Sequence, residues 1–183
     1  LVLTHAHPDH LNGLKAVVRN FKIGEYWEAF SPSEDEGYRE FKKSLAPSKL
    51  CKRVFRADSR QERAIRIDVL HPERGEPYVQ SIDNDHSLVL RLQYGETSFL
   101  FTGDISMVSE KKILEHSGEI KSQVLKSPHH GSGSSSSKDF LDRVAPCIVV
   151  VSVGEGNRYG FPDQKVLELY HEMGAKIYRT DLN

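Results

Sequence analysis

The chain carries Thr4-His5-Ala6-His7-Pro8-Asp9-His10 near its start, with three imidazoles and one carboxylate in the pattern H-x-H-x-D-H. An apolar run precedes this motif and an apolar pattern of helical spacing follows it, so the motif joins a buried strand to an amphipathic helix. Alternate residues of a strand point to the same side, which lets His5 and His7 hold one ion together. Asp9 and His10 follow where the chain turns and can reach a second ion. The stretch therefore predicts a site for two metal ions rather than a histidine-rich surface loop or a tag remnant.

The chemical type of the ligands limits the choice of metal. Imidazole and carboxylate groups without a thiolate suit zinc, manganese or iron. A two-metal site also needs a carboxylate that bridges the ions, and Asp104 is a candidate because it follows Gly103 at the end of a strand predicted over 98–102. Taken alone, an Asp after a strand is usually a turn residue. Because a histidine cluster is present elsewhere in the chain, we expect Asp104 to bridge the two ions.

A second histidine pair lies in Ser127-Pro128-His129-His130-Gly131, again directly after a predicted strand. Adjacent side chains diverge, so one imidazole can hold a metal ion while the other faces substrate. We expect His129 to be the ligand and His130 to be the group on the substrate side. The alternative is a surface turn with two solvated imidazoles, but the two clusters together hold most of the nine histidines of the chain.

The third protein ligand of the first ion stays open between two other histidines. His86 opens the strand that we predict around 87–93, and His71 is a weaker rival because it lies between Leu70 and Pro72. His116 and His171 fall inside or at the end of predicted helices, and we expect both to be solvated.

The composition is typical of a single water-soluble globular domain, with 183 residues of which 38% are hydrophobic and 28% charged. No apolar run approaches the roughly 18 residues of a membrane helix. The net charge of −1 lacks the basic balance of many nucleic-acid binders. The segment 49–66 is locally basic and lines either a polyanion path or an ordinary solvated face. Cys51 and Cys147 stand far apart and do not decide the redox compartment.

Short apolar runs alternate with helical periodicity, which favours an α/β layer fold in one domain over 1–183. Helices are predicted over 11–21, 38–45, 109–115, 138–144 and 164–173. Strands are predicted over 26–30, 53–55, 65–70, 87–93, 97–102, 123–126, 147–153 and 176–179, with an acidic loop over 31–37 and another loop over 71–85. The chain begins with Leu inside an apolar run, and we expect it to be a piece of something longer.

Several stretches together resemble the metallo-β-lactamase superfamily, and within it the metal-binding domain of ComEC-like DNA-uptake (competence) proteins. The resemblance rests on residues 3–14, 84–92, 101–104, 125–132, 152–154, 157–160 and 178–181. It implies an αββα sandwich with the metal ions at the strand ends. Members of this family carry strands before the first motif, and we expect these N-terminal strands to be missing here. The family sequence after Tyr-Gly usually has His-Pro, where this chain has Phe161-Pro162.

The resemblance implies a hydrolase that depends on two divalent metal ions, zinc or manganese, with iron as a further option. We expect a phosphodiesterase or nuclease that degrades DNA during uptake. Its partners would be DNA or another phosphodiester and, in a full-length protein, a membrane channel domain. The alternatives are another hydrolase of the same fold, such as a phosphocholine esterase or a lactone or thioester hydrolase, and a metal-bound module that binds DNA without catalysis.

The expected roles of single residues follow from this ligand set. Two divalent cations supply a water that attacks phosphorus near neutral pH. Asp9 orients this water or takes its proton while also acting as a ligand, and His130 stabilises or protonates the leaving oxygen. The Ser-rich loop 131–134 holds a phosphate oxygen through its N–H groups and hydroxyls. Asn157 and Arg158 contact the nucleic-acid backbone or only stabilise their loop. The predicted metal ligands are His5, His7, Asp9, His10, Asp104 and His129.

Overall fold

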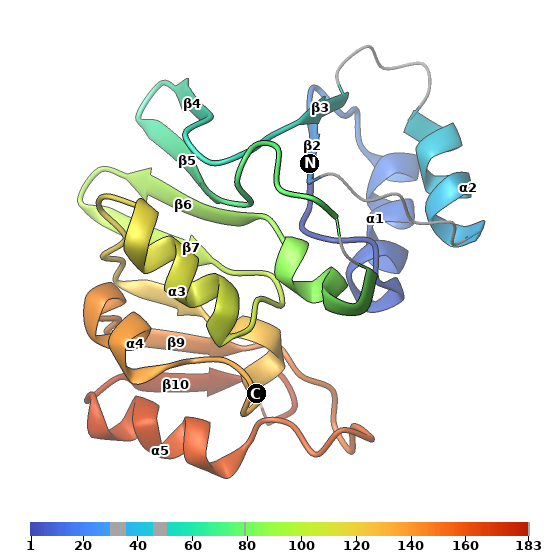
Figure 1. Cartoon of the computed structure of the whole chain (residues 1–183). Coiled ribbons are helices and arrows are strands. Elements are labelled where there is room, and N and C mark those ends of the chain that lie inside the picture. The colour runs from blue at the N-terminus through green and yellow to red at the C-terminus, as the bar shows by residue number, and fades with distance from the viewer. Residues whose placement is uncertain (30–35, 46–50, 79, 183) are drawn as a thin grey trace.

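The computed structural model describes residues 1–29, 36–45, 51–78 and 80–182. These residues form two β-sheets with helices on both outer sides (Figure 1). Helices α1 and α2 accompany the N-terminal sheet, and α3, α4 and α5 lie along the larger, C-terminal sheet. None of the described helices combines the length and the apolar character that a membrane span requires.

The larger sheet holds seven of the described strands in the order β10-β9-β8-β7-β6-β5-β4. The pairs β4–β5, β5–β6 and β6–β7 are antiparallel. The pairs β7–β8, β8–β9 and β9–β10 are parallel. Because parallel strands end at the same edge of a sheet, the carboxyl ends of β7 and β8 lie side by side. The strands are β4 (Ser59–Glu62), β5 (Ile65–His71), β6 (Val89–Tyr94), β7 (Thr97–Phe101), β8 (Val124–Lys126), β9 (Ile148–Val151) and β10 (Lys176–Arg179).

The smaller sheet consists of three parallel strands in the order β1-β2-β3 within the described ranges. Parallel neighbours need a crossover connection, and one helix follows each of the first two strands in the chain. Helix α1 begins at Pro8. Proline is favoured at this position because an N–H in the first turn would have no partner within the helix, so its absence costs nothing. These elements are β1 (Val2–Leu3), α1 (Pro8–Asn20), β2 (Tyr26–Glu28), α2 (Glu36–Leu45) and β3 (Cys51–Arg53).

Three helices pack on the larger sheet. Ser106 begins α3 by accepting a hydrogen bond from the Val108 N–H, and Asp163 begins α5 in the same way through the Lys165 N–H. Two short 3₁₀ segments, η1 and η2, lie between strands and carry residues of the site. The bounds are α3 (Met107–His116), α4 (Lys138–Val144), α5 (Gln164–Glu172), η1 (Gln80–His86) and η2 (Pro128–Gly131).

Separate apolar clusters fill the three spaces between four layers. The first lies between α1, α2 and the small sheet and includes the fully buried Phe41. The second joins the two sheets through Trp27 and Leu90, and the third joins the large sheet to α3, α4 and α5 through Leu125 and Tyr170. A helix–sheet–sheet–helix order needs these three interfaces. The predicted α/β fold with an αββα sandwich is thus confirmed.

Some local predictions differ from the structure. Strand β4 was not predicted, because Ser59–Glu62 is exposed and polar, and only its antiparallel pairing with β5 makes it a strand. The loop predicted over 71–85 contains most of η1, and the strand predicted over 53–55 lies at Cys51–Arg53. Phe30 and residues 31–35 of the predicted acidic loop lie outside the described residues.

Candidate metal centre

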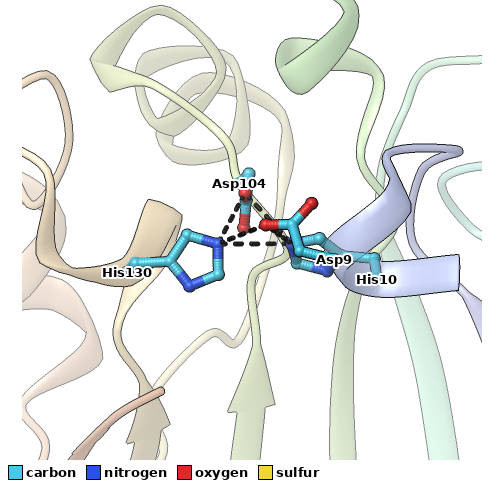
Figure 2. A group of neighbouring side chains, drawn as sticks. All are labelled: Asp9, His10, Asp104 and His130. Carbon is cyan, nitrogen blue, oxygen red and sulfur yellow. Dashed lines mark hydrogen bonds and ion pairs between the residues drawn. The ribbon is translucent and has the colours of Figure 1, made fainter. Parts of the chain in front are cut away.

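Four side chains from three separate parts of the chain point toward one another at the ends of the strands (Figure 2). Asp9 and His10 lie in the first turn of α1. Asp104 follows β7, and His130 lies in η2 directly after β8. Because β7 and β8 are parallel neighbours, their carboxyl ends bring Asp104 and His130 together.

The position of the first motif differs from the prediction. The prediction that His5 and His7 lie on a strand is wrong, because β1 ends at Leu3 and α1 already begins at Pro8. His5 and His7 therefore lie in the short loop between β1 and α1. Their rings are still close, with centroids 4.6 Å apart in an edge-to-face arrangement.

Asp104 occupies the centre of the cluster. The Nε2 atoms of His10 and His130 each lie 3.1 Å from Asp104 Oδ2, and these two nitrogens are 3.3 Å apart. His130 Nε2 also lies 3.4 Å from Asp9 Oδ2, and His5 Nε2 lies 3.8 Å from Asp104 Oδ2. One donor atom each from Asp9, His10, Asp104 and His130 fall within 4.8 Å of one another. Asp104 thus lies close to three imidazoles, those of His5, His10 and His130.

The backbone at the two strand ends has an unusual conformation. Gly103 has a φ of +56, and a Cβ at this position would lie 2.6 Å from the Cβ of Ser87, so the end of β7 requires glycine. His129 and His130 have φ values of 44 and 56, in the left-handed region that costs a residue with a Cβ about 1–2 kcal/mol. Such strain persists where surrounding contacts enforce it, and it is frequent at functional sites.

Two buried polar atoms of the site, His5 Nε2 and Asp104 Oδ1, have no hydrogen-bond partner among the described residues. Burial, assisted by the neighbouring His10, lowers the pKa of His5 to about 3, so its ring is neutral. The other ring nitrogen, Nδ1, lies 3.2 Å from Ser87 Oγ. Buried polar atoms without partners are costly, and divalent cations would satisfy both. The residues present therefore fit a metal centre with nitrogen and oxygen ligands.

Positive and hydrogen-bonding groups surround Asp104. Burial alone would raise its pKa, but hydrogen bonds from His10 and His130 and the charge of Lys126 outweigh burial and hold this pKa well below its usual range. Lys126 Nζ lies 3.7 Å from Asp104 Oδ1 and donates to the Gly103 carbonyl at 3.2 Å. Sequence reasoning missed Lys126, because a lysine at the end of a strand is more often a solvated surface residue.

His7 lies outside the group of four and pairs with a different carboxylate. Its Nε2 is 3.2 Å from Asp83 Oδ2, and the hydrogen bond to Asp83 raises the pKa of His7. Sequence reasoning missed Asp83 also, because a lone Asp in a loop carries no local signal of a metal site. Only the fold of η1 brings Asp83 beside the first motif.

The structure brings one residue of the second histidine pair into the group of four, and both residues line the cavity described below. His130, expected on the substrate side, lies among the carboxylates, whereas His129, expected as a ligand, lies outside the group of four. His129 Nε2 is 3.4 Å from Asn84 Nδ2. The backbone is left-handed at both residues, and the imidazole of His130 points toward Asp104 (Figure 2).

The two rivals for a third ligand have other contacts. His71 is buried and donates a hydrogen bond from Nε2 to the backbone carbonyl of Asp85 at 2.7 Å. The ring of His86 stacks on Tyr78, with centroids 4.8 Å apart. Neither belongs to the group of four, and His116 and His171 are exposed as expected.

A cavity of about 680 Å³ opens over the cluster. Its walls come from both ends of the chain and include residues of the loop after β9. The Ser-rich loop 131–134 does not belong to the described lining, and the Ser132 hydroxyl pairs instead with that of Ser134 at 3.0 Å. The described lining residues are His7, Asp9, Asn84, Asp104, His129, His130, Ser152, Val153, Gly154, Asn157, Tyr159, Phe161 and Thr180.

The described residues of the basic segment 49–66 do not line this cavity. Several of its cations are paired with carboxylates, which leaves less free positive charge for a polyanion and favours an ordinary solvated face. The pairs are Lys52 with Glu25, Arg56 with Glu73, Arg60 with Glu62, and Arg66 with Asp68.

A model of the metallo-β-lactamase superfamily matches residues 1–154. The chain belongs to the metallo-β-lactamase superfamily. This match confirms the family that the motifs predicted. Together with the His/Asp cluster, it makes the chain a metallo-β-lactamase-fold domain of the metal-dependent hydrolase type.

Curated relatives of this metallo-β-lactamase domain carry names from bacterial competence. ComE operon protein 3 of Bacillus subtilis is 31% identical over 185 residues, which covers 100% of this chain and 23% of that protein. Competence protein ComA of Neisseria gonorrhoeae is 34% identical over 185 residues, which covers 100% of this chain and 24% of that protein. The predicted resemblance to competence proteins is confirmed, and the chain spans less than a quarter of these relatives.

Solved structures share the metallo-β-lactamase fold at low sequence identity. CmlA, a diiron β-hydroxylase from Streptomyces venezuelae, is 15% identical with a TM-score of 0.65, covering 100% of this chain and 43% of that one. The metallo-β-lactamase fold protein YhfI from Bacillus subtilis is 14% identical with a TM-score of 0.56, covering 98% of this chain and 73% of that one. At these identities the likeness concerns the fold alone.

Proposed function

We propose that this domain is a metal-dependent phosphodiesterase that cleaves DNA as part of a competence protein. The observation that carries the proposal is the group of Asp9, His10, Asp104 and His130, three of which (Asp9, Asp104 and His130) line an open cavity. We take DNA as the substrate because the motifs resemble those of DNA-uptake proteins and one relative is named a competence protein. Because these relatives are about four times longer, we place the domain within a larger protein whose membrane channel would deliver the strand.

The proposed ligand set divides into two halves that share Asp104. His5 and His7 would hold one ion, and Asp9, His10 and His130 would hold the other. We assign His130 instead of His129 because its Nε2 lies 3.1 Å from Asp104 Oδ2. Zinc or manganese suits these ligands, and iron fits them as well. When bound, such a pair of ions supplies an activated water and neutralises phosphoryl charge.

The protein's own groups then act on the substrate. The exposed Asp9 carboxylate accepts, on its Oδ2 atom, the proton that the attacking water gives up. Burial lowers the pKa of His129, so its ring is neutral near pH 7 and donates a hydrogen bond to the leaving oxygen. Asn84 orients His129 through the contact between Nδ2 and Nε2. Lys126 keeps Asp104 ionised and in place.

Metal analysis combined with plasmid nicking tests the proposal. Asp104→Asn and His130→Ala should lose bound metal and reduce cleavage by at least about 100-fold, since both remove a ligand. His7→Ala should lose part of the metal and cleavage. His129→Ala should keep the metal and lose cleavage only. Matched controls are Asp142→Asn and His171→Ala, two exposed residues outside the cavity lining, and both should behave like the native protein.

Bound metal without cleavage of DNA or of bis(p-nitrophenyl) phosphate would overturn the phosphodiesterase proposal. A shift in the mobility of labelled DNA would then indicate a binding module. Turnover of a phosphocholine ester, a lactone or a thioester would indicate another hydrolase of this fold. If His129→Ala lost the metal and His130→Ala kept it, the ligand assignment of the pair would be reversed.

A further inference from the structure

One wall of the cavity is aromatic. Tyr159 and Phe161 both line it, and their rings stack with centroids 5.6 Å apart and an interplanar angle of 18°. The rings of His129 and Phe161 lie with their centroids 5.6 Å apart in an edge-to-face arrangement, so the wall is continuous with the histidine pair of the metal centre. Tyr159 is 63% exposed, so much of its ring is accessible to a molecule in the cavity.

The loop that carries these rings is held by its own hydrogen bonds. The Asn157 side chain donates to the carbonyls of Gly154 and Phe161 at 3.1 and 2.7 Å and accepts from the Phe161 N–H at 3.0 Å. Pro162 is buried against Gly131, where a Cβ would lie 2.6 Å from the proline Cβ. Of the two expected roles of Asn157, the structure supports the stabilisation of the loop. The aromatic wall is therefore held in a defined place beside the cluster.

A cation completes the outer edge of the wall. The Arg158 guanidinium lies 4.8 Å from the ring centroid of Tyr159 and donates to its hydroxyl at 2.6 Å. Arg158 is exposed, so its other N–H groups are open to water. Aromatic faces beside an arginine are the combination by which proteins hold single-stranded nucleic acid without reading its sequence.

We propose that Tyr159 and Phe161 form a subsite for one unpaired nucleobase next to the phosphate that is cleaved, with Arg158 on a neighbouring phosphate. This inference rests on the proposed phosphodiesterase function and narrows its substrate to single strands and frayed ends. A base within a duplex has both faces covered by its neighbours and cannot stack on the wall unless it is unpaired. The cavity of about 680 Å³ has room for one nucleotide beside the metal cluster.

The test compares a single-stranded oligonucleotide of about 12 residues with the same strand carrying abasic tetrahydrofuran units around one phosphate, and with its duplex. Cleavage is measured in the presence of Mn²⁺. Binding is measured by fluorescence anisotropy in the presence of EDTA, which removes the metal ions and so prevents cleavage. Native protein should prefer the base-bearing strand over the abasic strand and over the duplex. Tyr159→Ala and Phe161→Ala should raise KM and Kd for that strand about 5- to 100-fold, the usual range for one stacked base.

Two controls separate the stacking role from a structural one. Tyr159→Phe keeps the ring and should retain the native preference. Tyr94→Ala removes another exposed tyrosine, 59% exposed on β6 and outside the cavity lining, and should change nothing. Cleavage of the abasic strand should be the same in native protein and Tyr159→Ala, because that strand has no base to stack.

Equal binding of base-bearing and abasic strands by native protein would overturn the nucleobase subsite. An equal loss on both strands in Tyr159→Ala would do the same. Base-dependent binding that Tyr159→Ala abolishes would support the subsite even if no strand were cleaved, and such a lack of cleavage would overturn only the phosphodiesterase proposal.

Discussion

Replacement of Gly103 by alanine tests how tightly the end of β7 is packed beneath the metal centre. The φ of Gly103 is +56, where a side chain costs about 1–2 kcal/mol. The new Cβ would also lie 2.6 Å from Ser87 Cβ and 3.2 Å from Thr4 Cβ, and overpacking at a buried position costs about 1–3 kcal/mol. Together, Gly103→Ala should lower the free energy of unfolding by about 2–5 kcal/mol, a large part of the about 5–15 kcal/mol of a typical domain.

Two other glycines separate the conformational cost from the steric one. Gly174 has a φ of +74 and open space around its Cα, so Gly174→Ala should lose only about 1–2 kcal/mol. Gly118 has neither constraint, so Gly118→Ala should be neutral or gain up to about 1 kcal/mol. Urea unfolding followed by the fluorescence of Trp27, the single tryptophan, measures all three variants. The reasoning is refuted if Gly103→Ala costs no more than Gly174→Ala.

The same variant has a second readout at the site. Ser87 Oγ lies 3.2 Å from His5 Nδ1 and accepts a hydrogen bond from the Asp104 N–H at 3.1 Å. A displaced Ser87 would disturb both side chains, so Gly103→Ala should bind divalent metal about 10–100-fold more weakly in a chelator competition. Gly174→Ala should bind metal like the native protein.

Other charged contacts give further measurable effects. Lys126→Met removes the ammonium beside Asp104 and should weaken metal binding about 10–100-fold, measured by the same chelator competition. Arg158→Ala should reduce the slope of log Kd for single-stranded DNA against log salt by about 0.7, the value for one phosphate contact, in an anisotropy titration. Burial alone would raise the pKa of Glu28, but hydrogen bonds from Lys42, Tyr26 and Tyr38 outweigh it and hold the pKa below its usual 4.5. The stability from ionised Glu28 is therefore complete above about pH 4.5 and is lost as the pH falls through the lowered pKa. Lys42→Met should cost about 1–3 kcal/mol near pH 7 and flatten this acid-side loss in urea unfolding series, whereas a slope equal to the native one would contradict this account.

Elements with a strong local pattern were predictable from the sequence. The helix predicted over 138–144 and the strand predicted over 176–179 have these bounds in the structure, because apolar spacing and turn residues mark their ends. Strand β4 carries no such pattern, since Ser59–Glu62 is polar throughout, and its strand conformation depends on pairing with β5. Prediction failed here because the strand conformation comes from pairing with the next strand and not from an apolar pattern in β4 itself.

The sequence by itself determined the family and the chemical type of the candidate site, because both depend on residue types at fixed local spacing. The first motif and the Gly103-Asp104 pair contain imidazoles and carboxylates whatever the arrangement of the strands. Only the tertiary structure decided that His130 rather than His129 meets Asp104. The direction of these rings follows from a left-handed backbone beside Gly131, which packs on Pro162 about thirty residues later in the chain. The same contact places the aromatic wall, and no local pattern encodes a contact across that separation.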